Sequence, residues 1–315
     1  MSRAHRFVWA LVALVAMTAT AIVARSARRA WTLVHPGRTR VSAAARRQAF
    51  ADIPTLEDIT LHTADGLSLR GWFAAGSRRA VVVFVHGLWG NRLTLFPEAR
   101  LLFRHGYGVL LFDSRGSGDS DGDVVTWGDR EQLDARAAVD FVSSRSDVDP
   151  GSIAVLGFSV GASTVAMEVS RDPRPRAAIL CATWSSFNDE IRDKFATFGP
   201  LSWGPAMFAM RWAGVHPSEI RPIDYLPTVG PRPLLMITGT LDDDTPVQVE
   251  ERVFLAAAEP KQLWIVQGAR HGEYLSVAPS EYESRVVAFL DQALVGSAGT
   301  ASGSGLAIPA ERHGR

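Results

Sequence analysis

Cysteine and lysine are nearly absent from this chain of 315 residues. Cys181 is the only cysteine, which excludes an intramolecular disulfide and a metal cluster built on cysteine ligands. Lys194 and Lys261 are the only lysines, so almost all of the basic residues are arginines. The chain also lacks a basic stripe with interleaved aromatic residues, so it does not favour a nucleic-acid partner. The composition therefore does not favour a nucleic-acid partner, and it leaves the oligomeric state open. We also expect no metal and no cofactor, because the chemistry inferred below needs neither.

Acidic residues are absent from the first 50 positions, which hold nine arginines. Within this basic arm, residues 7–24 form an uncharged apolar run of about 18 residues that, at ~1.5 Å per residue, nearly crosses a ~30 Å hydrocarbon core. We predict an N-terminal membrane anchor over residues 1–29. The alternative is a signal peptide cleaved after Ala19-Thr20-Ala21, but the apolar run continues past that site.

Arginines flank the apolar run unequally. Two of them, Arg3 and Arg6, precede the run, whereas Arg25, Arg28, Arg29, Arg38 and Arg40 follow it. The positive-inside rule therefore predicts a single-pass protein of the cell membrane whose following domain lies on the cytoplasmic side. The alternative is an exported domain whose basic linker touches anionic head groups.

Strand-like and helix-like apolar patterns alternate along most of the remaining chain. Residues 30–55 look like a linker or a juxtamembrane helix, and a domain is predicted from 56 to 295. It begins with a β-hairpin over 56–73 that has a D-G turn. Strands are then expected at 80–85, 108–112, 152–156, 177–181, 234–238 and 262–266, with helices between them and after the last. This order predicts an α/β fold with a doubly wound, mostly parallel sheet, and functional groups at the carboxyl ends of its strands.

Two segments depart from this alternation. From about 184 to 226 the pattern breaks, and aromatic and methionine residues gather in the middle, which predicts a helical cap over the sheet. The alternative is a helical excursion that packs on the core and does not contact a substrate. Residues 296–315 are rich in Gly, Ser and Ala and are predicted to be a disordered tail.

The pentapeptide Gly157-Phe158-Ser159-Val160-Gly161 follows one predicted strand and precedes a helix. A serine hydroxyl becomes a useful nucleophile when a sharp turn exposes it to a base, and glycines allow strand and helix to crowd at that turn. A serine nucleophile also needs a base and a carboxylate that orients the base. His271 lies in a loop after the last predicted strand, and three acids, Asp242, Asp243 and Asp244, follow the preceding strand. Any of the three acids meets the positional requirement.

Over residues 56–294 the chain resembles the α/β-hydrolase superfamily. The resemblance rests on the order Ser, Asp, His, on the sharp turn at residues 157–161, called the nucleophile elbow, and on the pair His86-Gly87 after the first long buried strand. The resemblance implies a catalytic triad of Ser159, His271 and Asp242, because Gly239, Asp242 and Pro246 match the family pattern G-x-x-D-x-x-x-P; Asp243 is the reserve. It also implies an oxyanion hole formed by the backbone amides of Leu88 and Val160. The loop 113–120 is similar to the D-x-R-G-x-G-x-S loop of the family, where it is architectural.

These features predict a serine hydrolase that cleaves a carboxylic ester or related acyl bond through an acyl-enzyme, on a small-molecule or lipid-like acyl substrate. His86-Gly87-Leu88 departs from the H-G-G-G of many lipases. The alternatives are a thioesterase, an acyltransferase or a serine peptidase of the prolyl-oligopeptidase type, for whose propeller domain the residues before 56 leave little room. A membrane-anchored binding protein that keeps the fold without turnover is the alternative from another class.

Overall fold

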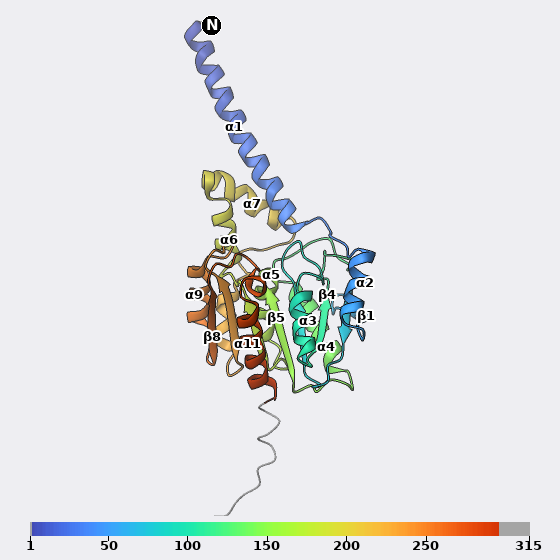
Figure 1. Ribbon diagram of the computed structural model, residues 1–315. Helices are drawn as coiled ribbons and strands as arrows, with labels where there is room; N and C mark the ends of the chain where they lie inside the picture. The colour runs from blue at the N-terminus through green and yellow to red at the C-terminus, as the bar shows by residue number, and fades with distance from the viewer. Residues whose placement is uncertain (1, 296–315) are drawn as a thin grey trace, which may run out of the picture.

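The computed structural model describes residues 2–295, and the predicted disordered tail lies outside these residues. An eight-stranded sheet forms the centre of the domain, in the order β1-β2-β4-β3-β5-β6-β7-β8 (Figure 1). Its strands are β1 (Glu57–His62), β2 (Ser68–Ala74), β3 (Val81–Val85), β4 (Gly108–Phe112), β5 (Ile153–Phe158), β6 (Ala177–Cys181), β7 (Leu234–Gly239) and β8 (Lys261–Val266). Strand β2 runs antiparallel to both of its neighbours, β1 and β4. The six strands from β3 to β8 are parallel to one another. The predicted doubly wound, mostly parallel sheet is confirmed.

Helices cover both faces of this sheet. Buried residues of α2, α3 and α11 pack on one face, and those of α4, α5 and α9 pack on the other. Every residue of β3 is buried, which explains its continuous Val-Val-Val-Phe-Val sequence, because a strand covered on both faces has no polar side. The helices of the domain are α2 (Ala43–Asp52), α3 (Phe96–Arg104), α4 (Glu131–Ser143), α5 (Val160–Val169), α9 (Val247–Ala256), α10 (Tyr274–Val277) and α11 (Pro279–Leu290), followed by a π-helical turn, Asp291–Val295.

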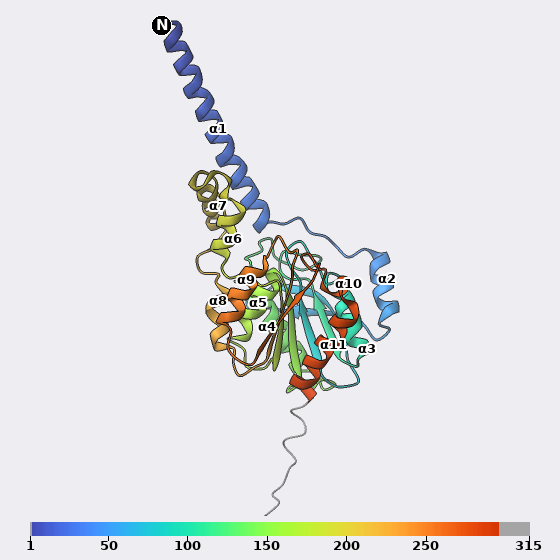
Figure 2. The same ribbon diagram turned by 60° about the vertical axis from the view of Figure 1, so that its left-hand side comes forward.

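The N-terminal helix α1 (Arg3–Val34) projects away from the domain (Figures 1 and 2). Of the residues that the structure describes, α1 is the one helix long and apolar enough to cross a membrane. It continues beyond the predicted anchor boundary at residue 29 and ends at Val34, directly before His35 and Pro36. Proline lacks an N–H and disfavours helical geometry in the preceding residue, so the helix stops there. The first residues of the segment expected to be a linker or a juxtamembrane helix are therefore the last turn of α1.

The segment between β6 and β7 forms a helical layer beside the lower half of α1 (Figures 1 and 2). It contains α6 (Phe187–Lys194), the 3₁₀ turn η1 (Ala196–Phe198), α7 (Pro200–Trp212), α8 (Pro222–Tyr225) and the 3₁₀ turn η2 (Leu226–Thr228). One apolar cluster joins this layer, called the cap below, to the end of α1 and to Val160 of α5. The cap therefore lies on the side of the domain where the parallel strands end.

Candidate active site

Ser159 lies between the end of β5 and the first residue of α5. Its backbone has φ +56° and ψ −119°, a conformation that residues other than glycine rarely adopt. The neighbouring glycines make this turn sterically possible. A Cβ at Gly157 would lie 2.4 Å from the carbonyl oxygen of Gly161, and one at Gly161 would lie 2.0 Å from that of Val85. The chain thus turns sharply from strand to helix and leaves the Ser159 side chain half-buried rather than enclosed.

His271 and Asp242 are in direct contact. The Nδ1 atom of His271 lies 2.8 Å from Oδ2 of Asp242, whose side chain is fully buried. His271 follows β8 and Asp242 follows β7, two adjacent parallel strands, so both residues lie at the same edge of the sheet as Ser159. A carboxylate in this position fixes the imidazole tautomer with its proton on Nδ1, which leaves Nε2 free to accept a proton.

The loop around Asp242 separates the three consecutive aspartates. Oδ1 of Asp242 accepts hydrogen bonds from the amides of Asp244 (3.0 Å) and Thr245 (2.8 Å). Asp243 and Asp244 are exposed, and Asp244 pairs with Lys194 of the cap at 3.3 Å. The structure therefore brings Asp242 to His271 and directs the reserve candidate, Asp243, toward solvent.

Tyr274 is a further member of this group that the sequence reasoning missed. Its hydroxyl donates to Oδ2 of Asp242 at 3.3 Å, and burial raises its pKa well above the ordinary tyrosine value. The hydroxyl thus stays protonated and remains a donor. Its place three residues after His271 is the only sequence signal that points to it.

Glu250 of α9 is a buried carboxyl group behind the acid loop. One of its oxygens accepts from the amide of Thr183 at 2.6 Å, whereas the other has no hydrogen-bond partner among the described residues. Burial raises the pKa of Glu250 well above the usual glutamate range, and the charge of Asp242 raises it further. We infer that Glu250 is held neutral, because its burial and the neighbouring Asp242 both disfavour a negative charge there.

No hydrogen bond joins Ser159 Oγ to His271 within residues 2–295. The imidazole packs instead beside Phe158, with ring centroids 4.7 Å apart. Gly272 lies against the same ring, since a Cβ there would be 2.9 Å from Phe158 Cζ. His271 is thus held next to the residue that precedes Ser159, and such serine–base contacts often tighten only when a substrate is bound.

Leu88 and Val160 line one small cavity together with His86. Val160 is the first residue of α5, where an amide has no acceptor within its own helix. Gly87 is packed against the serine, because a Cβ at this position would lie 3.1 Å from that of Ser159. The loop after β3 and the start of α5 therefore present their backbones on the same side of Ser159.

His86 shapes this loop. Its Nε2 accepts from the amide of Ser114 at 3.0 Å, and its Nδ1 donates to the carbonyl of Gly87 at 2.7 Å. Burial lowers the pKa of His86, which keeps the ring neutral and able to do both. Asp113, in the adjacent loop, accepts from the amides of Arg92 (2.7 Å) and Asp119 (2.9 Å). These bonds fix the backbone next to Leu88.

Aromatic residues of the cap and Trp127, which precedes α4, form an apolar wall next to Val160. Trp127 stacks on Phe187 with centroids 4.4 Å apart, and Trp184 packs beside both. The same cluster contains Leu33 and Val34 from the end of α1. No group of three or more His, Cys, Asp or Glu side chains in the described part of the chain is arranged to hold a metal ion. The site thus combines a polar serine–histidine–aspartate edge with an apolar wall.

Comparison with known proteins finds a family match for the sequence and a shared fold among solved structures. Residues 21–201 match the family described as X-Pro dipeptidyl-peptidase (S15 family). An uncharacterized protein of Mycobacterium tuberculosis is 33% identical over 266 residues, which cover 82% of this chain and 89% of that protein. A polyketide transferase of Stachybotrys chlorohalonatus is 25% identical over 276 residues, which cover 71% of this chain and 92% of the transferase.

Solved structures of esterases share the fold. An esterase of Pyrococcus furiosus superposes with a TM-score of 0.69 at 24% identity and covers 83% of this chain and 98% of its own. An acetyl xylan esterase of Paenibacillus superposes with a TM-score of 0.61 at 19% identity and covers 85% of this chain and 99% of its own. At these identities the likeness concerns the fold.

Proposed function

Because this chain belongs to the X-Pro dipeptidyl-peptidase (S15) family and is a serine hydrolase of the α/β fold, we propose that Ser159, His271 and Asp242 form its catalytic triad. The observation that carries the proposal is the 2.8 Å contact of His271 with the buried Asp242, at the sheet edge where Ser159 sits on a strained elbow. A strained conformation held by its surroundings is typical of functional positions.

The mechanism is a two-step acyl transfer. Ser159 attacks the carbonyl carbon while Nε2 of His271 takes the hydroxyl proton, and Asp242 stabilises the resulting imidazolium. The amides of Leu88 and Val160 face the developing oxyanion, where one such donor is typically worth about 3 kcal/mol. His271 then returns the proton to the leaving group. In the second step His271 takes a proton from the attacking water and gives it to Ser159 as the acyl group leaves.

We propose a carboxylic ester or a related acyl bond as the substrate, with an apolar acyl group. The wall formed by Trp127, Trp184 and Phe187 next to Val160 supports an apolar acyl group. The family description favours a second candidate, removal of X-Pro dipeptides, whose substrates carry a charged amino terminus. A thioesterase or an acyltransferase would use the same triad, and a polyketide transferase is among the relatives.

The experiment compares wild type and Ser159→Ala on p-nitrophenyl butyrate and on Ala-Pro-p-nitroanilide. We expect ester turnover by the wild type and a loss of roughly 10⁴-fold or more in Ser159→Ala, because the nucleophile is gone while the fold remains. Ser276→Ala, an exposed hydroxyl on α10, is the matched control and should keep full activity. A fluorophosphonate probe should label the wild type and not Ser159→Ala.

Three results decide between the candidates. Ester hydrolysis retained in Ser159→Ala contradicts the triad. Faster turnover of the anilide than of the ester assigns the peptidase activity instead. A wild type that neither turns over nor takes up the probe is the binding protein of the non-catalytic alternative.

We also propose that α1 anchors the protein in the cell membrane with the catalytic domain on the cytoplasmic side, on the strength of the arginines that follow the apolar run. Protease added to intact spheroplasts should leave the domain uncut, and the same protease should cut it after lysis. Cleavage before lysis would show that the domain lies outside the cytoplasm.

A further inference from the structure

The outer face of cap helix α7 is apolar, the reverse of an ordinary surface helix. Its inner face buries Ser202, Ala206, Ala209 and Met210. The outer face exposes Leu201 (42%), Phe208 (68%) and Trp212 (77%), and Phe198 just before the helix is 55% exposed. These side chains are spaced three, four or seven residues apart, so they share one side of the helix. An exposed apolar stripe of this kind marks a contact surface.

Charged residues are absent from this part of the cap. From 195 to 210 the sequence contains no Asp, Glu, Lys or Arg, and Lys194 and Arg211 stand at the two ends. The apolar run of α1 has the same arrangement, with Arg6 before it and Arg25 after it. Both segments thus have the composition that a lipid environment selects, an apolar stretch with basic ends.

The tip of the cap lies beside the end of the apolar run of α1 and the first arginines after it. One pocket of about 440 Å³ between them is lined on α1 by residues from Thr18 to Arg29, Arg25 among them, and on the cap by Lys194, Phe195 and Phe198. Thr18 is seven residues before Arg25, which is about 10 Å along the helix axis. If Arg25 lies at the head groups, Phe198 reaches into the acyl region. Amphipathic helices typically insert their apolar face by ~5–10 Å.

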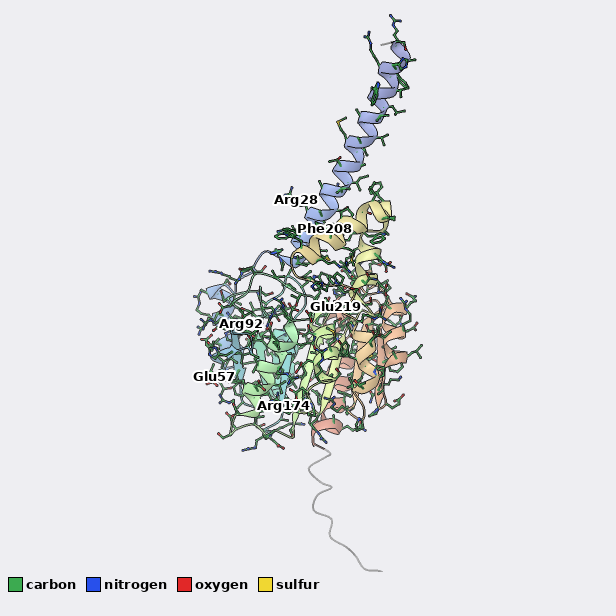
Figure 3. The ribbon with its side chains drawn as sticks, turned by 180° about the vertical axis from the view of Figure 1, so that it is seen from behind. Arg28, Glu57, Arg92, Arg174, Phe208 and Glu219 are labelled. Atoms are coloured by element: carbon green, nitrogen blue, oxygen red, sulfur yellow. The ribbon has the colours of Figure 1, made fainter. Side chains whose placement is uncertain are left out.

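The other end of α7 lies at the level of the basic residues. A groove between the helices is lined by Ala27, Arg28 and Trp31 on α1 and by Phe208 and Trp212 on the cap. Figure 3 shows Phe208 on α7 next to Arg28 of α1, with Glu219 nearer to the sheet. Trp and Arg side chains are enriched at the membrane–water interface, because they present an apolar body and a polar end.

The cap is held against α1 rather than free to rotate away. The guanidinium of Arg29 donates to the carbonyl of Lys194 at 3.2 Å and lies over the ring of Phe195 at 5.1 Å. Any leaflet that surrounds residues 18–25 of α1 therefore also surrounds the tip of the cap.

From these contacts we propose that the cap is a second membrane-contacting element: residues 198–212 are immersed in the leaflet that α1 enters, and the occupant of their apolar face is lipid. The immersed surface is continuous with α1, and the arginines at its border match anionic head groups. Because the cap lies on the side of the domain where the strands end, an acyl chain that leaves this leaflet meets the cap before it meets Ser159.

Site-directed spin labelling of the full chain in anionic phospholipid vesicles tests this proposal. The native Cys181 is fully buried with a raised pKa, so it does not compete for the thiol reagent, and the wild type serves as the blank. Labels are placed by Leu201→Cys and Phe208→Cys on the cap, by Val15→Cys on α1 as the membrane reference, and by Glu219→Cys as the matched control. Glu219 is an exposed cap residue that lies outside the apolar stripe and nearer to the sheet (Figure 3).

We expect the ratio of oxygen to nickel-chelate accessibility at 201 and 208 to exceed that at 219 by about tenfold and to stay below that at 15, since oxygen concentrates in lipid and the chelate in water and the cap inserts less deeply than α1. Nickel accessibility at 201 and 208 equal to that at 219 overturns the proposal. Shielding from both reagents with dipolar broadening between labels also overturns it, because a second copy of the chain then covers the face. The labels report depth whether or not the triad is active.

Discussion

At the residue scale, the adjacent aspartates Asp242 and Asp243 have the same side chain but different surroundings. Asp242 is buried and bonded to His271, whereas Asp243 is exposed. We expect Asp242→Asn to lower kcat by about 10²–10⁴-fold, because an amide at this position neither holds the tautomer nor stabilises the imidazolium. Steady-state kinetics on p-nitrophenyl butyrate measures the effect.

Asp243→Asn is the matched control, since it makes the same chemical change one residue away. It should leave kcat within about twofold, as substitutions of exposed residues away from the chemistry usually do. Equal losses of kcat in the two variants, or a larger loss in Asp243→Asn, would show that Asp242 is not the acid of the triad.

The residues of the site differed in how well the sequence predicted them. Ser159 and His271 were placed because each follows a strand whose apolar run is unambiguous, and such positions converge at one sheet edge. Tyr274 and Glu250 were missed, because a polar side chain shows its burial only when other elements cover it. Glu250 lies on α9, and its partner Thr183 follows β6, 67 residues earlier in the chain. No local pattern records a contact of that separation.

At the element scale, the packing of α5 onto the sheet depends on the absence of a side chain at Gly161. A Cβ there would lie 2.0 Å from the carbonyl oxygen of Val85, a backbone atom that cannot move without shifting β3. We expect Gly161→Ala to destabilise the domain by about 3 kcal/mol or more, as overpacking against a rigid neighbour does. For a domain of this size that lowers Tm by roughly 6–12 °C.

Gly37→Ala is the control for this prediction. Gly37 is exposed, and a Cβ there meets nothing within 4 Å. The substitution should change the free energy of unfolding by less than about 0.5 kcal/mol. A thermal melt of both variants in the same detergent checks the pair, and an unchanged Tm in Gly161→Ala contradicts the claim that the elbow requires glycine.

Elements with a single strong pattern were predicted well, and elements with a mixed pattern were not. The run of β3 is apolar at every position, so its strand character and its burial were both evident. The last turn of α1 directly follows Arg28 and Arg29, and the segment from residue 30 looks like a linker or a juxtamembrane helix, although Ser26, Ala30, Leu33 and Val34 follow helical spacing on one buried face. Four such positions, one of them a serine, in a segment that also holds arginines are too weak a pattern to distinguish a packed helix end from a solvated linker.

At the scale of the whole molecule, α1 is long and apolar enough at one end to cross a membrane, and its other end is packed into the domain. Ala30 and Val34 are fully buried in the cluster that contains the cap and Val160. The carbonyl of Val34 accepts from the amide of Val125 at 2.8 Å, and that of Leu33 accepts from the indole of Trp127 at 3.1 Å. The end of the helix is thus part of the apolar wall beside the candidate active site.

Two truncations separate these roles. Removing residues 1–34 takes away the buried Leu33 and Val34, at about 1.5–3 kcal/mol each, and leaves the Trp127 indole unpaired. We expect a loss of about 4–8 kcal/mol in the free energy of unfolding and a fall in kcat, because Val125 and Val160 line the same cavity beside Leu88. Removing residues 1–17 leaves those contacts intact and should keep both Tm and kcat on a soluble ester. Melting curves and ester kinetics of the two truncations in one detergent measure the difference. If the shorter chain is as stable and as active as the longer one, the end of α1 is only a tether, and the coupling of membrane anchor to active site is wrong.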